Sequence, residues 1–176
     1  HDLEHDDYLK ELVNQVMVRN RRQDTGIEWT NRQVNIIPIQ FTAEEKEVYE
    51  LILDLKNISP VFSGAFSMIT LQKEMCSSKE ATFLTLNKMR QNCTSLEENN
   101  SVENVMQKLM ALDINSKAEK AFEIVSKAQD KVIIFTEYKA SQAYLQWFLH
   151  TKGITSVLFN GKFNKNKRDY MKHLFK

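Results

Sequence analysis

One short apolar segment, 131–135, limits the fold of this chain more than any other feature. It reads Lys-Val-Ile-Ile-Phe and lies between two stretches with helical spacing of apolar residues, 117–128 and 140–152. Continuous apolar runs of this length are typical of parallel strands that are buried on both faces of a sheet. The segment therefore predicts a strand between two helices, which is the repeating unit of a parallel α/β sheet.

The residues that follow continue this alternation. Gly153 suits the C-terminal cap of the helix at 140–152, the segment 155–159 predicts a second strand, and Asn160-Gly161 predicts a turn. A final helix should bury the apolar residues that recur at helical spacing, Tyr170, Met171, Leu174 and Phe175. Two parallel strands leave the edges of a sheet open, so we expect the natural protein to continue past Lys176.

The first 115 residues have a mostly helical pattern. Three stretches show apolar residues at helical spacing, 6–18, 66–89 and 102–112. The polar and acidic stretch 92–101 suits a loop. Residues 33–41 alternate between two faces and predict one strand, which Pro38 restricts to a sheet edge or a bulge.

A helix start is predicted at Thr42. Thr42 and Glu45 form a capping box, in which each side chain binds the backbone N–H of the other residue, and Ser59-Pro60 ends the helix. From Ser116 onward the pattern changes from helical to alternating. We therefore predict two domains, a helical 1–115 with one strand and an α/β unit at 116–176, and an α/β fold class overall.

Composition favours a globular protein in water. Of the 176 residues, 42% are hydrophobic and 27% are charged, and no apolar stretch approaches the ~20 residues that span a bilayer. The first residues are polar and acidic, which differs from the basic and then apolar pattern of a secretory signal. We expect a cytoplasmic protein that does not bind membranes.

No metal or redox site is expected. Cys76 and Cys93 have neither a CxxC neighbour nor a histidine set at metal spacing. The segment 1–5 matches an inverted zinc-peptidase pattern, His-x-x-Glu-His. It has no preceding helix to fix its geometry and no third ligand downstream, so we do not expect it to bind zinc.

The order of motifs in the first part resembles one family. Val16-Met17-Val18 leads into Arg19, Arg21 and Arg22, and Thr42-Ala43-Glu44-Glu45 then precedes a helix with a tyrosine. This order resembles the lobe-joining region of Swi/Snf-type ATPases in helicase superfamily 2, above all bacterial members akin to the RNA-polymerase-recycling ATPase. The resemblance implies that the three arginines brace two motor lobes through pairing with carboxylates, although they could instead contact nucleic acid.

The second part resembles the same family more closely. Ser116-Lys117-Ala118, the segment 131–138, and Phe159-Asn160-Gly161 followed by Arg168 are similar to the opening of the second RecA-like lobe. The resemblance implies that 116–176 is an incomplete RecA-like parallel α/β unit. It also implies a parent protein that moves along nucleic acid with energy from ATP.

The motifs for ATP hydrolysis are missing from this chain. There is no G-x-x-x-x-G-K-[ST] loop, because Phe163 follows Gly161-Lys162 and no glycine lies five residues upstream. An Asp-Glu box for magnesium and an arginine-finger motif are also lacking, so phosphoryl transfer would have no electrostatic stabilisation. We expect the chain to be inactive alone and to need no cofactor, whereas the resemblance implies ATP and magnesium for the full-length protein.

Two groups of residues are candidates for nucleic-acid contacts. Thr136, Lys139 and Ser141 come after the predicted strand at 131–135 and lie at the start of the next helix. Backbone N–H groups at a helix start favour a phosphate. Ordinary capping by Ser141 and a solvated Lys139 are the alternative. A second patch for backbone contacts could form from Gly161 and Lys162 and from the residues that follow them, Lys165, Lys167 and Arg168. The alternatives are a solvated helix face and an ion pair of Arg168 with an acidic neighbour.

These patterns lead to a first functional hypothesis. The chain is expected to be a fragment of an ATP-dependent Swi/Snf-family translocase that couples the two lobes and contacts the nucleic-acid backbone, with duplex DNA as substrate. RNA polymerase or another DNA-bound protein could be a partner, and a second copy could pair through the open sheet edge. The competing hypothesis is a non-catalytic helical protein-interaction module, which the helical stretch 42–112 favours.

Overall fold

The computed structural model describes residues 8–13, 16–17 and 33–176. The chain divides into two compact units, 1–37 and 38–176. In the first unit residues 8–13 and 16 are helical, as predicted for 6–18, and the remainder of that prediction lies outside the described residues. The apolar side chains of the described turns, including Tyr8 and Leu9, are exposed. The predicted domain boundary at residue 116 stays a prediction.

Every regular element of the described residues is a helix, so the predicted α/β class is wrong. No strand forms within 8–13, 16–17 or 33–176, and the predicted strands at 33–41, 131–135 and 155–159 are neither helical nor paired in a ladder. A strand is stabilised by the strand beside it, through ladder hydrogen bonds and cross-strand side-chain contacts. No described segment pairs with these three, and Phe135 is accordingly 91% exposed. The described residues therefore contain no RecA-like parallel unit.

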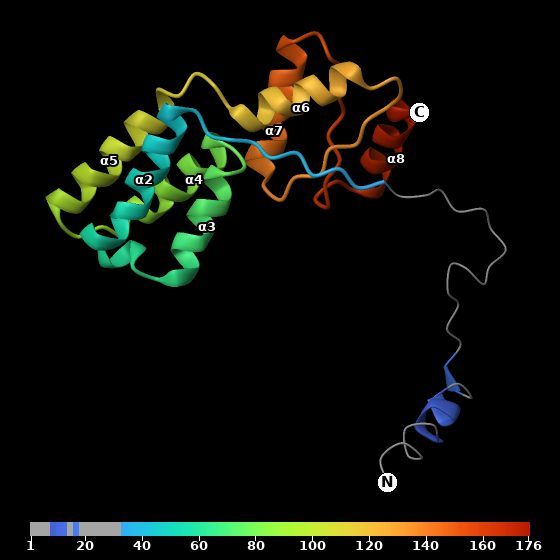
Figure 1. The fold of residues 1–176 in the computed structure, drawn as a ribbon, viewed down its shortest axis with the longest axis horizontal. Helices are drawn as coiled ribbons and strands as arrows, with labels where there is room; N and C mark the ends of the chain where they lie inside the picture. Colours follow the sequence, from blue (N-terminus) through green and yellow to red (C-terminus); the bar gives the residue numbers. More distant parts are fainter. Residues whose placement is uncertain (1–7, 14–15, 18–32) are drawn as a thin grey trace. The chain divides into compact units, whose positions relative to one another are not determined.

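The second unit begins with a helical bundle. Its elements are α2 (Ala43–Ile58), the short η2 (Pro60–Phe62), α3 (Ala65–Met75), α4 (Lys79–Arg90) and α5 (Leu96–Met110). The four α-helices pack side by side (Figure 1). Their shared core contains side chains that are completely buried, Ile52, Phe62, Leu71, Leu86 and Leu109. This core explains why the stretch stays compact without a sheet.

The starts of these helices follow local capping signals. The capping box at α2 is confirmed, because Glu45 N–H donates to Thr42 Oγ1 over 3.2 Å and Thr42 N–H donates to Glu45 Oε2 over 2.9 Å. The single helix predicted at 66–89 is instead two helices, since Ser78 caps a new start at α4. The predicted loop at 92–101 is also partly wrong, because Ser95 caps α5 and the helix begins at Leu96.

Three more helices follow the bundle, α6 (Ser116–Lys127), α7 (Lys139–Thr151) and α8 (Lys165–Phe175). Gly153 ends α7 with a φ of 81°, and the N–H groups of Gly153 and Ile154 donate to the carbonyls of His150 and Leu149. These two bonds form a Schellman motif, as a glycine at this position predicts. The burial predicted for α8 is wrong for Tyr170 and Leu174, which are exposed.

Polar contacts connect α6 and α7 with the bundle. The buried Glu45 carboxylate accepts from the Ser116 N–H over 2.9 Å and from the Ser116 hydroxyl. The Lys117 ammonium donates to the carbonyl of Cys76 over 3.3 Å. These bonds fix the starts of α2 and α6 to each other, and the Ser141 hydroxyl connects α7 with the bundle through bonds to the hydroxyls of Ser77 and Ser78.

Among the helices that the structure describes, none has the length and apolar character needed to cross a membrane.

Candidate nucleic-acid interface

Lys139 occupies the first position of α7, at a helix end with unsatisfied N–H groups. The preceding residue, Tyr138, stands at the N-cap and its side chain makes no capping hydrogen bond. The first N–H groups of a helix have no partner inside the helix, and they carry a partial positive charge. The structure thus places Lys139 at a helix start, and its contact with a phosphate stays a prediction.

Lys162 lies on the turn that joins residue 159 to α8. The predicted turn at Asn160-Gly161 is confirmed, and the Lys162 N–H donates to Asn160 Oδ1 over 3.1 Å. This is an Asx turn, in which the asparagine side chain replaces a backbone acceptor. A side chain at Gly161 would meet no atom within 4 Å, so the backbone of this turn is open to a ligand.

Hydrogen bonds of Gln142 with Phe159 and Asn160 hold the turn that carries Lys162 against the first turn of α7, which begins with Lys139. Loss of water around the Lys139 ammonium lowers its pKa, and the charge and hydrogen bonding of the neighbouring Lys162 lower the pKa further. Both side chains are exposed. Two ammonium groups that repel each other at an uncapped helix start form a local positive field, which a phosphate oxygen would neutralise.

Ser141 has a different position from the one predicted. Its side chain is 1% exposed, and its hydroxyl shares hydrogen bonds of 2.8 Å with the hydroxyls of Ser77 and Ser78. Ser78 also caps α4 by accepting from the Ala81 N–H. The Ser141 hydroxyl is therefore occupied within the chain, where it links α7 to the start of α4.

Of the remaining predicted residues, the structure describes Thr136 and Arg168. Thr136 is half-buried, three residues before Lys139. Arg168 is exposed in the first turn of α8 and makes no ion pair with a carboxylate of the described residues. Arg19, Arg21 and Arg22 lie outside the described residues, so their role as a brace stays a prediction.

Two acidic side chains near α7 carry buried oxygen atoms. Burial raises the pKa of Glu74, although the Thr85 hydroxyl donates to its Oε1 over 2.9 Å and the charge of Lys88 acts in the opposite direction. Burial likewise raises the pKa of Glu80 in the first turn of α4. Within the described part of the chain no partner reaches Glu74 Oε2 or Glu80 Oε2. These carboxyls belong to the packing of α3, α4 and α7, and neither is a predicted nucleic-acid contact.

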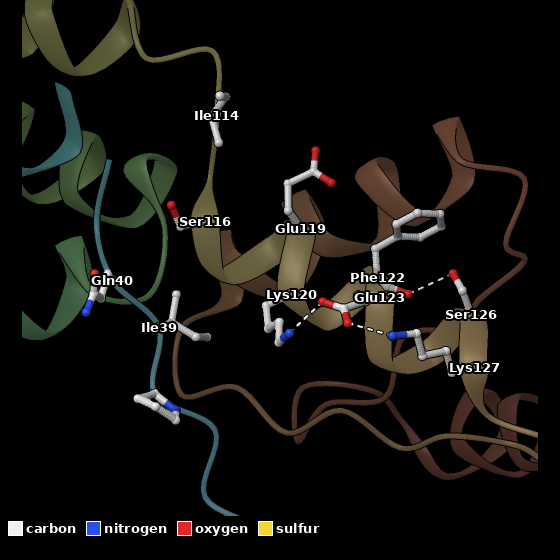
Figure 2. Close-up of a pocket in the computed structure, with 11 residues that line it drawn as sticks. Ile39, Gln40, Ile114, Ser116, Glu119, Lys120, Phe122, Glu123, Ser126 and Lys127 are labelled. Carbon is white, nitrogen blue, oxygen red and sulfur yellow. Dashed lines mark hydrogen bonds and ion pairs between the residues drawn. The ribbon is translucent and has the colours of Figure 1, made fainter. Parts of the chain in front are cut away.

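An open groove of about 710 Å³ lies elsewhere, between residues 38–40 and α6. Figure 2 shows Glu123 between Lys120 and Lys127, which donate to its two oxygens over 2.5 and 2.7 Å. These bonds and charges lower the pKa of Glu123 to about 2. The second carboxylate of the groove, Glu119, lies 3.5 Å from the Lys152 ammonium, and no predicted site residue lines the groove.

The described residues contain neither a glycine-rich phosphate loop nor a cluster of metal ligands. In the turn at Gly161-Lys162 the Lys162 N–H already donates to Asn160 Oδ1, and Asn164 caps α8 by accepting from the Lys167 N–H over 2.9 Å. A glycine-rich loop that runs directly into a helix is what a triphosphate requires, and this turn does not provide one. Nor does any cluster of three or more metal-ligating side chains occur in the described segments.

Comparison with known proteins gives one informative similarity. The chain is 44% identical, over 178 aligned positions and 99% of its length, to the "Uncharacterized ATP-dependent helicase YqhH" of Bacillus subtilis (strain 168). It spans 32% of that protein. No family model matches the chain, and no solved structure matches it. The chain is thus similar to about a third of a protein named as an ATP-dependent helicase.

Proposed function

We propose that this chain is a part of an ATP-dependent helicase and that Lys139 and Lys162 bind backbone phosphates of nucleic acid, with duplex DNA as the substrate. The 44% identity to a protein of that name supports the first half of the proposal. The observation that carries the second half is the attachment of the turn that carries Lys162 to the uncapped first turn of α7, where Lys139 lies. Both residues come from segments for which the sequence predicts phosphate contact.

Electrostatics explains why such a pair suits a phosphate. Holding two ammonium groups together is unfavourable without an anion, and an anion between them removes this cost. The free N–H groups at the start of α7 can donate to further oxygens of the same phosphate. None of these contacts reads a base, so the proposed binding is independent of sequence and sensitive to salt.

The finer proposal is a translocase of the Swi/Snf type. In it Arg19, Arg21 and Arg22 would couple two parts of the motor, and ATP with magnesium would bind outside the described part of this chain, which has neither a glycine-rich phosphate loop nor a cluster of metal ligands. RNA polymerase or another DNA-bound protein is proposed as a partner of the longer protein. The chain itself is proposed to supply backbone contacts and coupling without hydrolysing ATP.

The experiment is a binding titration of the chain with a fluorescent 20-base-pair duplex at several salt concentrations. Lys139→Ala and Lys162→Ala should each weaken binding, and each should lower the slope of log K against log salt by about 1, because one counterion fewer is released. Lys56→Ala is the matched control, since this exposed lysine lies in the last turn of α2. It should change neither quantity.

Two results would contradict the proposal. An affinity that does not depend on salt would mean that phosphates are not the ligand. Equal losses in Lys56→Ala and Lys139→Ala would mean that only the overall charge matters. If the chain bound no DNA but bound another protein regardless of salt, the non-catalytic interaction module would be favoured. The α2–α5 bundle would then be the surface that contacts the partner.

A further inference from the structure

We infer that Gln142 is the positioning residue of the lysine pair: its carboxamide holds the 159–162 turn against α7 and thereby places Lys162 beside Lys139. This inference rests on the proposed phosphate-binding function and adds the residue that assembles the site. Gln142 is assigned no contact with nucleic acid. Its effect on binding acts through the position of Lys162.

Both ends of the Gln142 side chain are used in this contact. Its Nε2 donates to the backbone carbonyl of Phe159 over 3.0 Å, and its Oε1 accepts from Asn160 Nδ2 over 3.3 Å. Asn160 in turn accepts from the Lys162 N–H with Oδ1 over 3.1 Å. A continuous path of hydrogen bonds therefore runs from α7 through the asparagine to the backbone of Lys162.

The helical register places this path beside Lys139. Residues three apart in a helix share a face and lie about 5–6 Å from each other, and Lys139 and Gln142 have this spacing in the first turn of α7. A turn that is held by Gln142 must therefore present its next residues close to Lys139. The lowering of the Lys139 pKa by the neighbouring Lys162 agrees with this geometry.

The chemistry of the contact requires a carboxamide. The side chain must donate to a carbonyl and accept from an amide at the same time, which a carboxylate or an ammonium cannot do. A carboxamide is also neutral, so it leaves the positive charge of Lys139 and Lys162 available to a phosphate. The preceding residue, Ser141, was predicted to contact a phosphate, but its hydroxyl bonds to Ser77 and Ser78 instead.

Gln146 is a matched control in the same helix. It lies one turn further along α7, and its Nε2 donates to the carbonyl of Ser156 over 3.1 Å. It thus holds the same connecting segment with the same type of bond, but three residues before Phe159. If Gln142 acted only by packing the connector against α7, the two glutamines would have the same effect.

The first measurement is the pKa of the Lys139 ammonium, determined by NMR titration of the whole chain without DNA. Gln142→Ala should raise this pKa toward its ordinary value, because Lys162 is released. Lys162→Ala shows how far the pKa rises when the neighbour is absent. Gln146→Ala should leave the pKa as it is in the wild type, and thermal melts establish that every variant is folded.

The second measurement is a double-mutant cycle on affinity for the 20-base-pair duplex. Gln142→Ala and Asn160→Ala should each weaken binding by about fivefold, the size expected for losing one hydrogen bond. The double variant should be no weaker than either single variant, since both interrupt one path. Gln146→Ala should bind as the wild type does.

The outcomes separate this inference from the proposed function. A Lys139 pKa that is unchanged in Gln142→Ala, or changed equally in Gln146→Ala, would overturn the inference even if DNA binds. Additive losses in the cycle would also overturn it, because Gln142 would then contact DNA by itself. Absence of DNA binding by the wild-type chain would contradict the proposed function, while the pKa comparison would still decide whether Gln142 positions the pair.

Discussion

The α2–α5 bundle and the residues from 116 onward are held together by different forces. In the bundle, large apolar side chains such as Phe62 are completely buried in one shared core. After residue 115 the described apolar side chains that are buried are few, Ala118, Phe148 and Leu149, whereas Ile133 and Phe135 are exposed. Here polar contacts, including those of Ser116, Ser141 and Gln142, connect the segments, together with the aromatic contact of Phe122 with Phe148.

The difference separates the main source of stability from the region of the proposed site. A core that excludes water is strong but does not depend on single hydrogen bonds. Polar contacts are weaker one by one, but each of them fixes the direction of a particular residue. The lysine pair lies in the second kind of region, which agrees with a site whose geometry depends on a few side chains.

The largest expected effect comes from the core. Phe62→Ala should lower the free energy of unfolding by about 3–5 kcal/mol, because it removes a fully buried ring and leaves a cavity. Phe135→Ala removes the same type of ring from an exposed position and should change the free energy of unfolding by less than about 0.5 kcal/mol. Urea denaturation measures both. Equal losses would mean that the exposed segment is packed in solution, and the contrast between the regions would be wrong.

An intermediate effect is expected at Glu45, which caps α2 and binds Ser116. Glu45→Ala should cost about 2 kcal/mol, since a buried carboxylate with several donors is lost. Glu47→Ala, two residues along, removes only an exposed ion pair with Lys108 and should cost less than about 1 kcal/mol. Thermal denaturation of the two variants gives the comparison. A cost at Glu47 as large as that at Glu45 would contradict the capping role.

The smallest effect is a pH dependence at Glu123 on α6. Lys120 and Lys127 lower its pKa from 4.5 to about 2. A carboxyl whose pKa is depressed by folding stabilises the fold above its ordinary pKa, and this stabilisation is lost as the pH falls toward 2. NMR titration should show the low pKa in the wild type and a higher one in Lys127→Ala. The same Glu123 pKa in both proteins would show that Lys127 does not pair with Glu123 in solution. Lys117→Ala is the control and should leave the pKa of Glu123 unchanged.

Local signals in the sequence predicted most helices because they act within one turn. The capping box at Thr42, the stop at Ser59-Pro60 and the left-handed Gly153 all depend on neighbours a few residues away. Two signals of the same kind were missed. Ser95 stands three residues before Glu98, and Ser78 precedes α4, so the starts of both helices were present in the pattern.

The strands could not be predicted from local signals, because a strand requires a partner that the segment itself does not specify. The run at 131–135 has the composition of a buried strand, yet no described segment pairs with it. The site was predictable in part. Charge and turn residues indicated Lys139 and Lys162, but the burial of Ser141 and the role of Gln142 depend on contacts with Ser77 and Asn160, distant in sequence.

Hydrogen exchange of the chain with and without the 20-base-pair duplex tests the proposed interface most directly. If Lys139 and Lys162 bind a phosphate, DNA should slow exchange at the first amides of α7 and in the turn at 159–163, and should leave the core of the α2–α5 bundle unchanged. Protection on the bundle, with no change at the start of α7, would contradict the assignment of the interface to the lysine pair.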